Sequence, residues 1–176
     1  MRVAVVFGQF GAAADPVNLP HFRDRLAQAG VETILVEHTD TQKVFDFGRG
    51  YTKPFGIVGA SLGAGVAPIM AGYLKPLAVD FVGGFQPSDW DPVMHAVCIK
   101  SGLDVITRAV TVPANVITAL CFRNPNFALT GGLGHATYVL DDARTKLQVI
   151  EREDPHPGDF GEAQDQMFDA CMEALK

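Results

Sequence analysis

One pentapeptide, Gly59-Ala60-Ser61-Leu62-Gly63, has the residue types and spacing of a nucleophilic serine turn. It follows the short apolar run 55–58 and precedes the small-residue run 65–71, so a strand is expected to pass directly into a helix. Such a turn holds the serine at unfavourable backbone angles, which the flanking glycines make sterically tolerable. The chemistry it indicates is acyl transfer, with Ser61 attacking a carbonyl carbon. The alternative interpretation is a tight packing turn in which Ser61 only caps the helix.

A second alternative treats the glycines at 59, 63 and 65 as a loop that cradles a phosphate at a helix amino terminus. The spacing is not G-x-G-x-x-G, and no G-K-[ST] follows, so a nucleotide site is disfavoured. The histidines and carboxylates show no metal-ligand spacing such as H-E-x-x-H. The chain has three cysteines, Cys98, Cys121 and Cys171. They form no C-x-x-C pair, which argues against a zinc site or a disulfide framework. We expect no cofactor and no metal.

The elements that must position Ser61 follow from the apolar periodicity. Continuous apolar runs predict strands at 2–7, 31–36, 55–59, 78–84 and 116–122. Helical patterns cover 17–29, 64–74, 91–102 and 161–175, and Pro68 is expected in the first turn of its helix. The segments 136–140 and 146–150 flank a polar stretch at 141–145 and are expected to pair as a hairpin.

Alternating apolar strands and helices predict an α/β fold, a three-layer α-β-α sandwich with a mainly parallel sheet of five to six strands. The C-terminal hairpin and a terminal helix would complete it. The length of 176 residues and the 48% hydrophobic content suit one domain spanning 1–176.

The overall charge and hydropathy exclude several partners. A net charge of −6 without a basic run argues against nucleic acid, because that binding neutralises several phosphates at once. No apolar run is long enough for a membrane span, and the first residues do not form an export signal. We therefore expect a cytoplasmic protein whose partner is a small-molecule or acyl ester substrate.

With its serine elbow and strand–helix order, the chain resembles the α/β-hydrolase superfamily, in particular small cutinase- and esterase-like members without a cap domain. The resemblance implies the triad order serine, acid, histidine. It places the general base between the last strand and the last helix, where this chain has His156 between two prolines. His135, in a glycine-rich stretch, is the alternative base. The three remaining histidines are expected to be structural or on the surface, and they are His21, His38 and His95.

An oxyanion hole needs two converging backbone N–H groups. One is expected from Leu62, the residue after the candidate nucleophile, at the amino end of the helix. The second is expected from Gln9 or Phe10, in the glycine-containing loop after the first strand. The alternative for 8–12 is an ordinary loop.

The acid of the triad is not settled by the sequence. At its usual place, after the second strand beyond the elbow, the chain has Asn124, whose amide could orient an imidazole but cannot offset its charge. One strand earlier, Asp89 and Asp91 are the leading candidates, and the alternative is that both are solvated turn residues. Asp159 is a lesser option, and a dyad without an acid would be slower.

The sequence therefore predicts a serine hydrolase for carboxylic esters or thioesters. The alternative is a non-catalytic binding or structural protein that keeps the same fold, because fold alone does not decide function.

Overall fold

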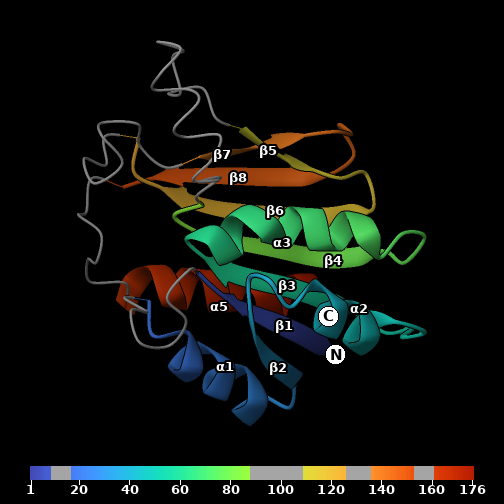
Figure 1. Ribbon diagram of the computed structural model, residues 1–176. Helices are drawn as coiled ribbons and strands as arrows, with labels where there is room; N and C mark the ends of the chain where they lie inside the picture. Colours follow the sequence, from blue (N-terminus) through green and yellow to red (C-terminus); the bar gives the residue numbers. More distant parts are fainter. Residues whose placement is uncertain (9–16, 88–108, 126–135, 153–160) are drawn as a thin grey trace.

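A six-stranded, entirely parallel sheet forms the centre of the computed structural model, which describes residues 1–8, 17–87, 109–125, 136–152 and 161–176 (Figure 1). The strand order is β2-β1-β3-β4-β6-β8. The strands are β1 (Arg2–Phe7), β2 (Glu32–Glu37), β3 (Phe55–Ala60), β4 (Val79–Phe85), β6 (Val116–Arg123) and β8 (Lys146–Glu151). This arrangement confirms the predicted α/β class and the mainly parallel sheet.

Helices cover both faces of the sheet and form the two outer layers. Along β1, Val3 and Val5 pack into the core shared with α1 (Leu19–Gln28) and α5 (Gly161–Ala174). The alternate residues Ala4 and Val6 pack on the opposite face, which is covered by α2 (Thr41–Gly48) and α3 (Leu62–Tyr73). Successive strand residues point to opposite faces, so a strand buried on both sides must be apolar throughout. Among the helices of the described residues, none is long and apolar enough to cross a membrane.

The central strands are tied together by aromatic packing as well as by their backbone ladders. Phe85 of β4 and Phe122 of β6 are register partners whose rings stack at 5.8 Å. Phe22 of α1 meets Phe85 edge-on at 6.0 Å, which anchors this helix to the sheet. The cluster lies at the carboxyl ends of the strands, directly beneath the edge where Ser61 lies.

The expected hairpin of 136–140 with 146–150 is wrong. β7 (Thr137–Leu140) pairs in parallel with β5 (Ala109–Val112) in a separate two-stranded sheet, whereas β8 pairs in parallel with β6. The connection between β7 and β8 also bonds to the last residue of β5 and to the first residue of β6. Asp141 donates its N–H to the carbonyl of Val112 at 3.0 Å, and Thr145 Oγ1 donates to the carbonyl of Val116 at 2.7 Å.

Three smaller differences concern the helices and the short strand. The sequence patterns did not predict α2 or β5, and Pro68 lies in the interior of α3 instead of its first turn. The terminal helix is present as α5. The helix expected at 91–102 lies outside the described residues.

Candidate active site

Ser61 occupies the turn between β3 and α3 in a backbone conformation that side-chain-bearing residues rarely adopt. Its φ is 53° and its ψ is −121°. The backbone is held on both sides, because the Ser61 N–H donates to Phe85 at 2.9 Å and the Ser61 carbonyl accepts from Gly65 at 3.0 Å. Ser61 stands at the N-cap position of α3, yet its side chain makes no capping hydrogen bond. A helix cap therefore does not account for serine at this position.

The two glycines of the pentapeptide are required by backbone packing. A Cβ at Gly59 would lie 2.4 Å from the carbonyl carbon and oxygen of Gly63. A Cβ at Gly63 would lie 2.2 Å from the carbonyl oxygen of Val6. These clashes are with backbone atoms, which cannot rotate away as a side chain can. The close approach of β1, β3 and α3 therefore forces the sharp turn that carries Ser61.

The carboxyl end of β1 lies directly against Ser61. A Cβ placed on Gly8 would be 3.0 Å from Ser61 Cβ and 3.4 Å from Ser61 Oγ. The carbonyl of Gly8 lies 3.2 Å from Nδ1 of His38, which follows β2. A carbonyl can only accept, so Nδ1 of His38 carries the proton of this bond. The residue that follows β1 thus lies against the serine, and His38 in turn holds that residue from the end of β2.

A buried tyrosine stabilises the first turns of α3. Pro68 has no N–H, so the carbonyl of Ala64, four residues earlier, lacks its usual helical donor. The hydroxyl of Tyr138, from β7, donates to that carbonyl at 2.7 Å. Gly84 makes room for this contact, because a Cβ there would lie 2.3 Å from the Tyr138 hydroxyl oxygen. The helix that begins after Ser61 is therefore bonded to the small β5–β7 sheet.

We expect Tyr138→Phe to lower the free energy of unfolding by about 1–3 kcal/mol, because the buried carbonyl of Ala64 would lose its donor without any apolar gain. Tyr73→Phe is the matched control, since Tyr73 is 66% exposed and its loss should change stability by about 0.5 kcal/mol or less. Urea unfolding of both variants measures the difference. Equal stability of the two variants would show that the Tyr138 bond contributes nothing.

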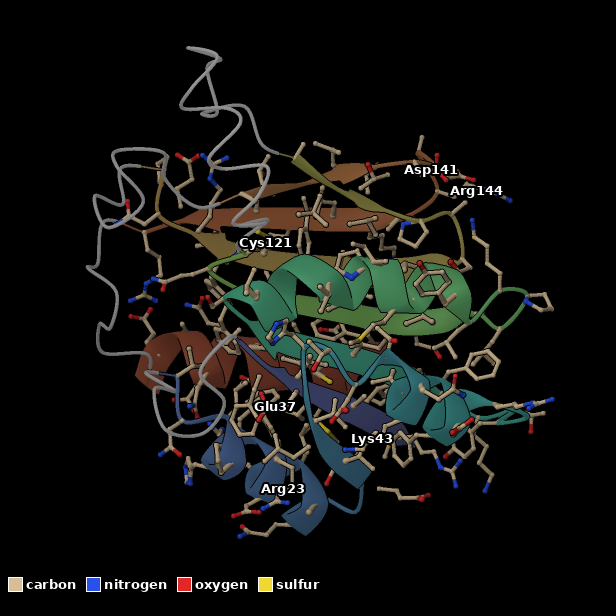
Figure 2. All side chains as sticks on the ribbon, viewed as in Figure 1. Arg23, Glu37, Lys43, Cys121, Asp141 and Arg144 are labelled. Carbon is tan, nitrogen blue, oxygen red and sulfur yellow. The ribbon has the colours of Figure 1, made fainter. Side chains whose placement is uncertain are left out.

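The described cysteines are unsuited to nucleophilic chemistry. Burial raises the pKa of the Cys121 thiol to about 12, and it raises the pKa of the Cys171 thiol to about 12 as well. Cys121 lies on the sheet face beneath α3 (Figure 2). Because the thiolate is the reactive form, both side chains act as small core residues. Within the described part of the chain, no three His, Cys, Asp or Glu side chains gather into a potential metal site.

The carboxyl ends of β4 and β6 carry polar residues beside the serine edge. Asn124 follows β6 and is 5% exposed, and Gln86 follows β4 at 3% exposed with a φ of 52°. Asn124 therefore stands at the end of the second strand beyond β3 in the sheet, where the resemblance expects an acid. Among the described residues, no carboxylate occupies that strand end.

The structure describes only part of the predicted site. It includes Ser61 and Leu62, and the N–H groups at the start of α3 precede the first intrahelical bond, leaving them without helical acceptors. The other predicted site residues lie outside the described residues, and they are Gln9, Phe10, Asp89, Asp91 and His156. The alternatives His135 and Asp159 also lie outside them.

The sequence patterns did not predict the contributions of Gly8 and Tyr138. A proline inside a helix pattern signals a carbonyl in need of a donor, but nothing local identifies Tyr138 as that donor, 74 residues away. The sequence indicates only a loop at Gly8, and its contact with Ser61 depends on the pairing of β1 with β3.

The parallel sheet order, the helices on both faces and the strained turn after β3 define an α/β-hydrolase fold. The same fold is found in a crystal structure from Xanthomonas campestris pv. campestris, described there as a candidate hydrolase of the alpha/beta superfamily. The two share 14% sequence identity with a TM-score of 0.55, over 98% of this chain and 97% of that one. No family model matches the chain, and no curated protein matches it in sequence.

Proposed function

We propose that this protein is a serine hydrolase that cleaves carboxylic esters or thioesters through an acyl-enzyme on Ser61. The observation that carries the proposal is the backbone of Ser61, at φ 53° and ψ −121°, enforced by the close packing at Gly59 and Gly63. Strain of this kind costs about 1–3 kcal/mol and persists where the surrounding structure enforces it, most often at functional sites. No capping bond offsets that cost here.

The proposed reaction follows general acyl-transfer chemistry. Ser61 Oγ attacks the ester carbonyl while His156 accepts its proton, and the resulting oxyanion accepts hydrogen bonds from the N–H of Leu62 and from Gln9 or Phe10. The tetrahedral intermediate collapses, and His156 returns the proton to the leaving alcohol or thiol. Water, deprotonated by His156, then attacks the acyl-enzyme, and release of the acid regenerates the Ser61 hydroxyl.

Asp89 or Asp91 would orient His156 in this scheme, and a working dyad is the variant without either acid. The fold supports a hydrolase in general, and the ester specificity is our extension of it. Soluble residence in the cytoplasm remains part of this proposal.

A second candidate function is a non-catalytic protein that retains the fold. The observation that favours it is Asn124, which stands at the strand end where a carboxylate is expected. An amide there would leave a histidine imidazolium without a compensating charge.

A fluorophosphonate probe separates the two functions. If the hydrolase proposal holds, the probe labels the folded protein covalently, mass spectrometry places the adduct on the peptide containing Ser61, and Ser61→Ala removes it. Ser88→Ala and Ser101→Ala, which alter the other two serines, should label like the unmodified protein. Absence of labelling in well-folded protein supports the non-catalytic candidate.

A further inference from the structure

Arg123, the last residue of β6, has a largely buried side chain whose Nε has no hydrogen-bond partner among the described residues. Its side chain is 18% exposed, and among the described residues the carboxylate that it contacts is Glu151, with Oε1 3.8 Å from Nε. That distance exceeds a hydrogen bond, and within the part of the chain that the structure describes the buried Nε has no hydrogen-bond partner. A charged donor withdrawn from water without a partner is costly, so its presence requires an explanation.

Other arginines of the same molecule show what ordinary pairing looks like. Their guanidinium nitrogens lie 2.6 to 2.8 Å from a carboxylate oxygen, and they are Arg2, Arg23 and Arg25. All three are more exposed than Arg123, at 26%, 35% and 27% of the side chain. Glu151 is 62% exposed and does not approach closely. The most buried of these four arginines is thus the one with the longest contact to a carboxylate.

Arg123 lies at the same edge of the sheet as Ser61. Ala60, Phe85 and Phe122 form one row across β3, β4 and β6, and Ser61 and Arg123 each follow directly after that row. Two strand spacings separate their backbones, about 10 Å. Arg123 follows Cys121 by two residues along β6, and residues two apart in a strand point to the same face of the sheet. Cys121 packs in the core beneath α3, so the Arg123 side chain also leaves the sheet on the face that α3 covers.

We propose that Arg123 binds a carboxylate on the acyl chain of the substrate and thereby selects half-esters of short dicarboxylic acids over neutral esters. The inference rests on the proposed esterase function and names its substrate class. The ester carbonyl would lie at Ser61 while the distal carboxylate pairs with the guanidinium. A planar guanidinium suits this role because it donates two parallel hydrogen bonds to a carboxylate.

The charge around Ser61 also favours an anionic substrate, although the chain as a whole has a net charge of −6. The amino end of α3 carries the positive end of a helix dipole, and Arg123 leaves the sheet on the same face. An anionic acyl chain would thus meet two positive features, and the long contact to Glu151 leaves the guanidinium available. A neutral acyl chain would bury the same charge without pairing it, which penalises that substrate.

The test compares two esters that differ in one group, 4-nitrophenyl hydrogen glutarate and 4-nitrophenyl valerate, whose acyl chains end in a carboxylate and a methyl group. Hydrolysis by Ser61→Ala gives the background for each ester. We expect the unmodified protein to favour the glutarate half-ester in kcat/KM by about tenfold or more. Arg123→Met should lower its kcat/KM about 10- to 100-fold, mainly through KM, and should change the valerate value by about twofold or less. Arg123→Lys should fall between the two proteins, because it keeps the charge without the planar fork.

Arg144→Met is the matched control for charge. Arg144 lies in the turn before β8, at the opposite end of the strand from Glu151, and it is 85% exposed (Figure 2). Its loss should leave the rates with both esters unchanged. Because Arg123→Met removes a buried side chain, the circular dichroism of this variant is recorded first. If the variant is unfolded, the inference is tested by the ester preference of the unmodified protein and by the kcat/KM values of Arg123→Lys.

The outcomes distinguish the inference from the function on which it rests. Ser61-dependent hydrolysis of the valerate ester without preference for the glutarate half-ester overturns the inference and leaves the esterase proposal intact. Fluorophosphonate labelling of Ser61 without turnover of the glutarate half-ester does the same. Failure of both labelling and hydrolysis overturns the esterase proposal, and the inference with it.

Discussion

Replacing Ser61 with glycine is expected to stabilise the protein and to abolish the proposed esterase activity at the same time. At φ 53° and ψ −121° the serine backbone is strained, whereas glycine adopts these angles freely. Relief of about 1–3 kcal/mol is opposed by about 1 kcal/mol from the greater freedom of glycine in the unfolded chain. We therefore expect a net gain of up to about 2 kcal/mol in the free energy of unfolding.

Ser61→Ala is the matched control for this prediction. Alanine retains the Cβ and hence the strain, so its stability should stay close to that of the unmodified protein. Both variants lack the hydroxyl, and both should lose ester hydrolysis by on the order of 10⁴-fold or more. Thermal unfolding and 4-nitrophenyl butyrate hydrolysis measure the two effects. If Ser61→Gly proves no more stable than Ser61→Ala, backbone strain at this turn is not the cost we assign to it.

The second large effect is expected from Gly63→Ala. The added Cβ would lie 2.2 Å from the carbonyl oxygen of Val6 and 2.6 Å from that of Phe7, so β1 and α3 would have to separate. Overpacking of a rigid contact usually costs about 1–3 kcal/mol, and we expect at least the upper end here because both sides are backbone. The same shift would displace Leu62 and Ser61, so ester hydrolysis should fall as well.

Gly72→Ala, in the same helix, isolates the effect of packing. A Cβ there would meet nothing closer than 3.8 Å, which is ordinary contact. Because glycine is a poorer helix former than alanine, this control should gain about 0.5–1 kcal/mol. Chemical denaturation of the two variants gives the comparison. Similar stabilities for Gly63→Ala and Gly72→Ala would contradict the packing explanation of the elbow.

Much of the central sheet was predictable because its inner strands are buried on both faces and are therefore mostly apolar. β1, β3, β4 and β6 follow this rule, and their predicted ranges agree with the structure. The prediction failed where local signals were ambiguous. A polar stretch between two β-rich segments is typical of a hairpin. The sequence patterns did not predict β5, the strand with which β7 pairs, so the segment at 146–150 was the expected partner of β7.

The position of the site was also predictable in part. The glycine spacing around Ser61 is visible within one pentapeptide, and that short segment carries the signal, although the packing that requires Gly63 comes from β1. The positions of Arg123 and Tyr138 relative to it depend on strand order, which no local pattern contains. For the predicted base, His156, and for Asp89 and Asp91, the sequence remains the only basis.

By itself the sequence determined that a serine would stand at a strained strand-to-helix turn on an α/β scaffold, because the glycine spacing and the apolar strand and helix patterns are each contained in short segments. The tertiary structure alone decided that Gly8 lies against that serine, that Tyr138 bonds to Ala64, and that Arg123 shares its edge of the sheet. Those contacts join strands and helices far apart along the chain, and they form only when the parallel sheet sets its order and register.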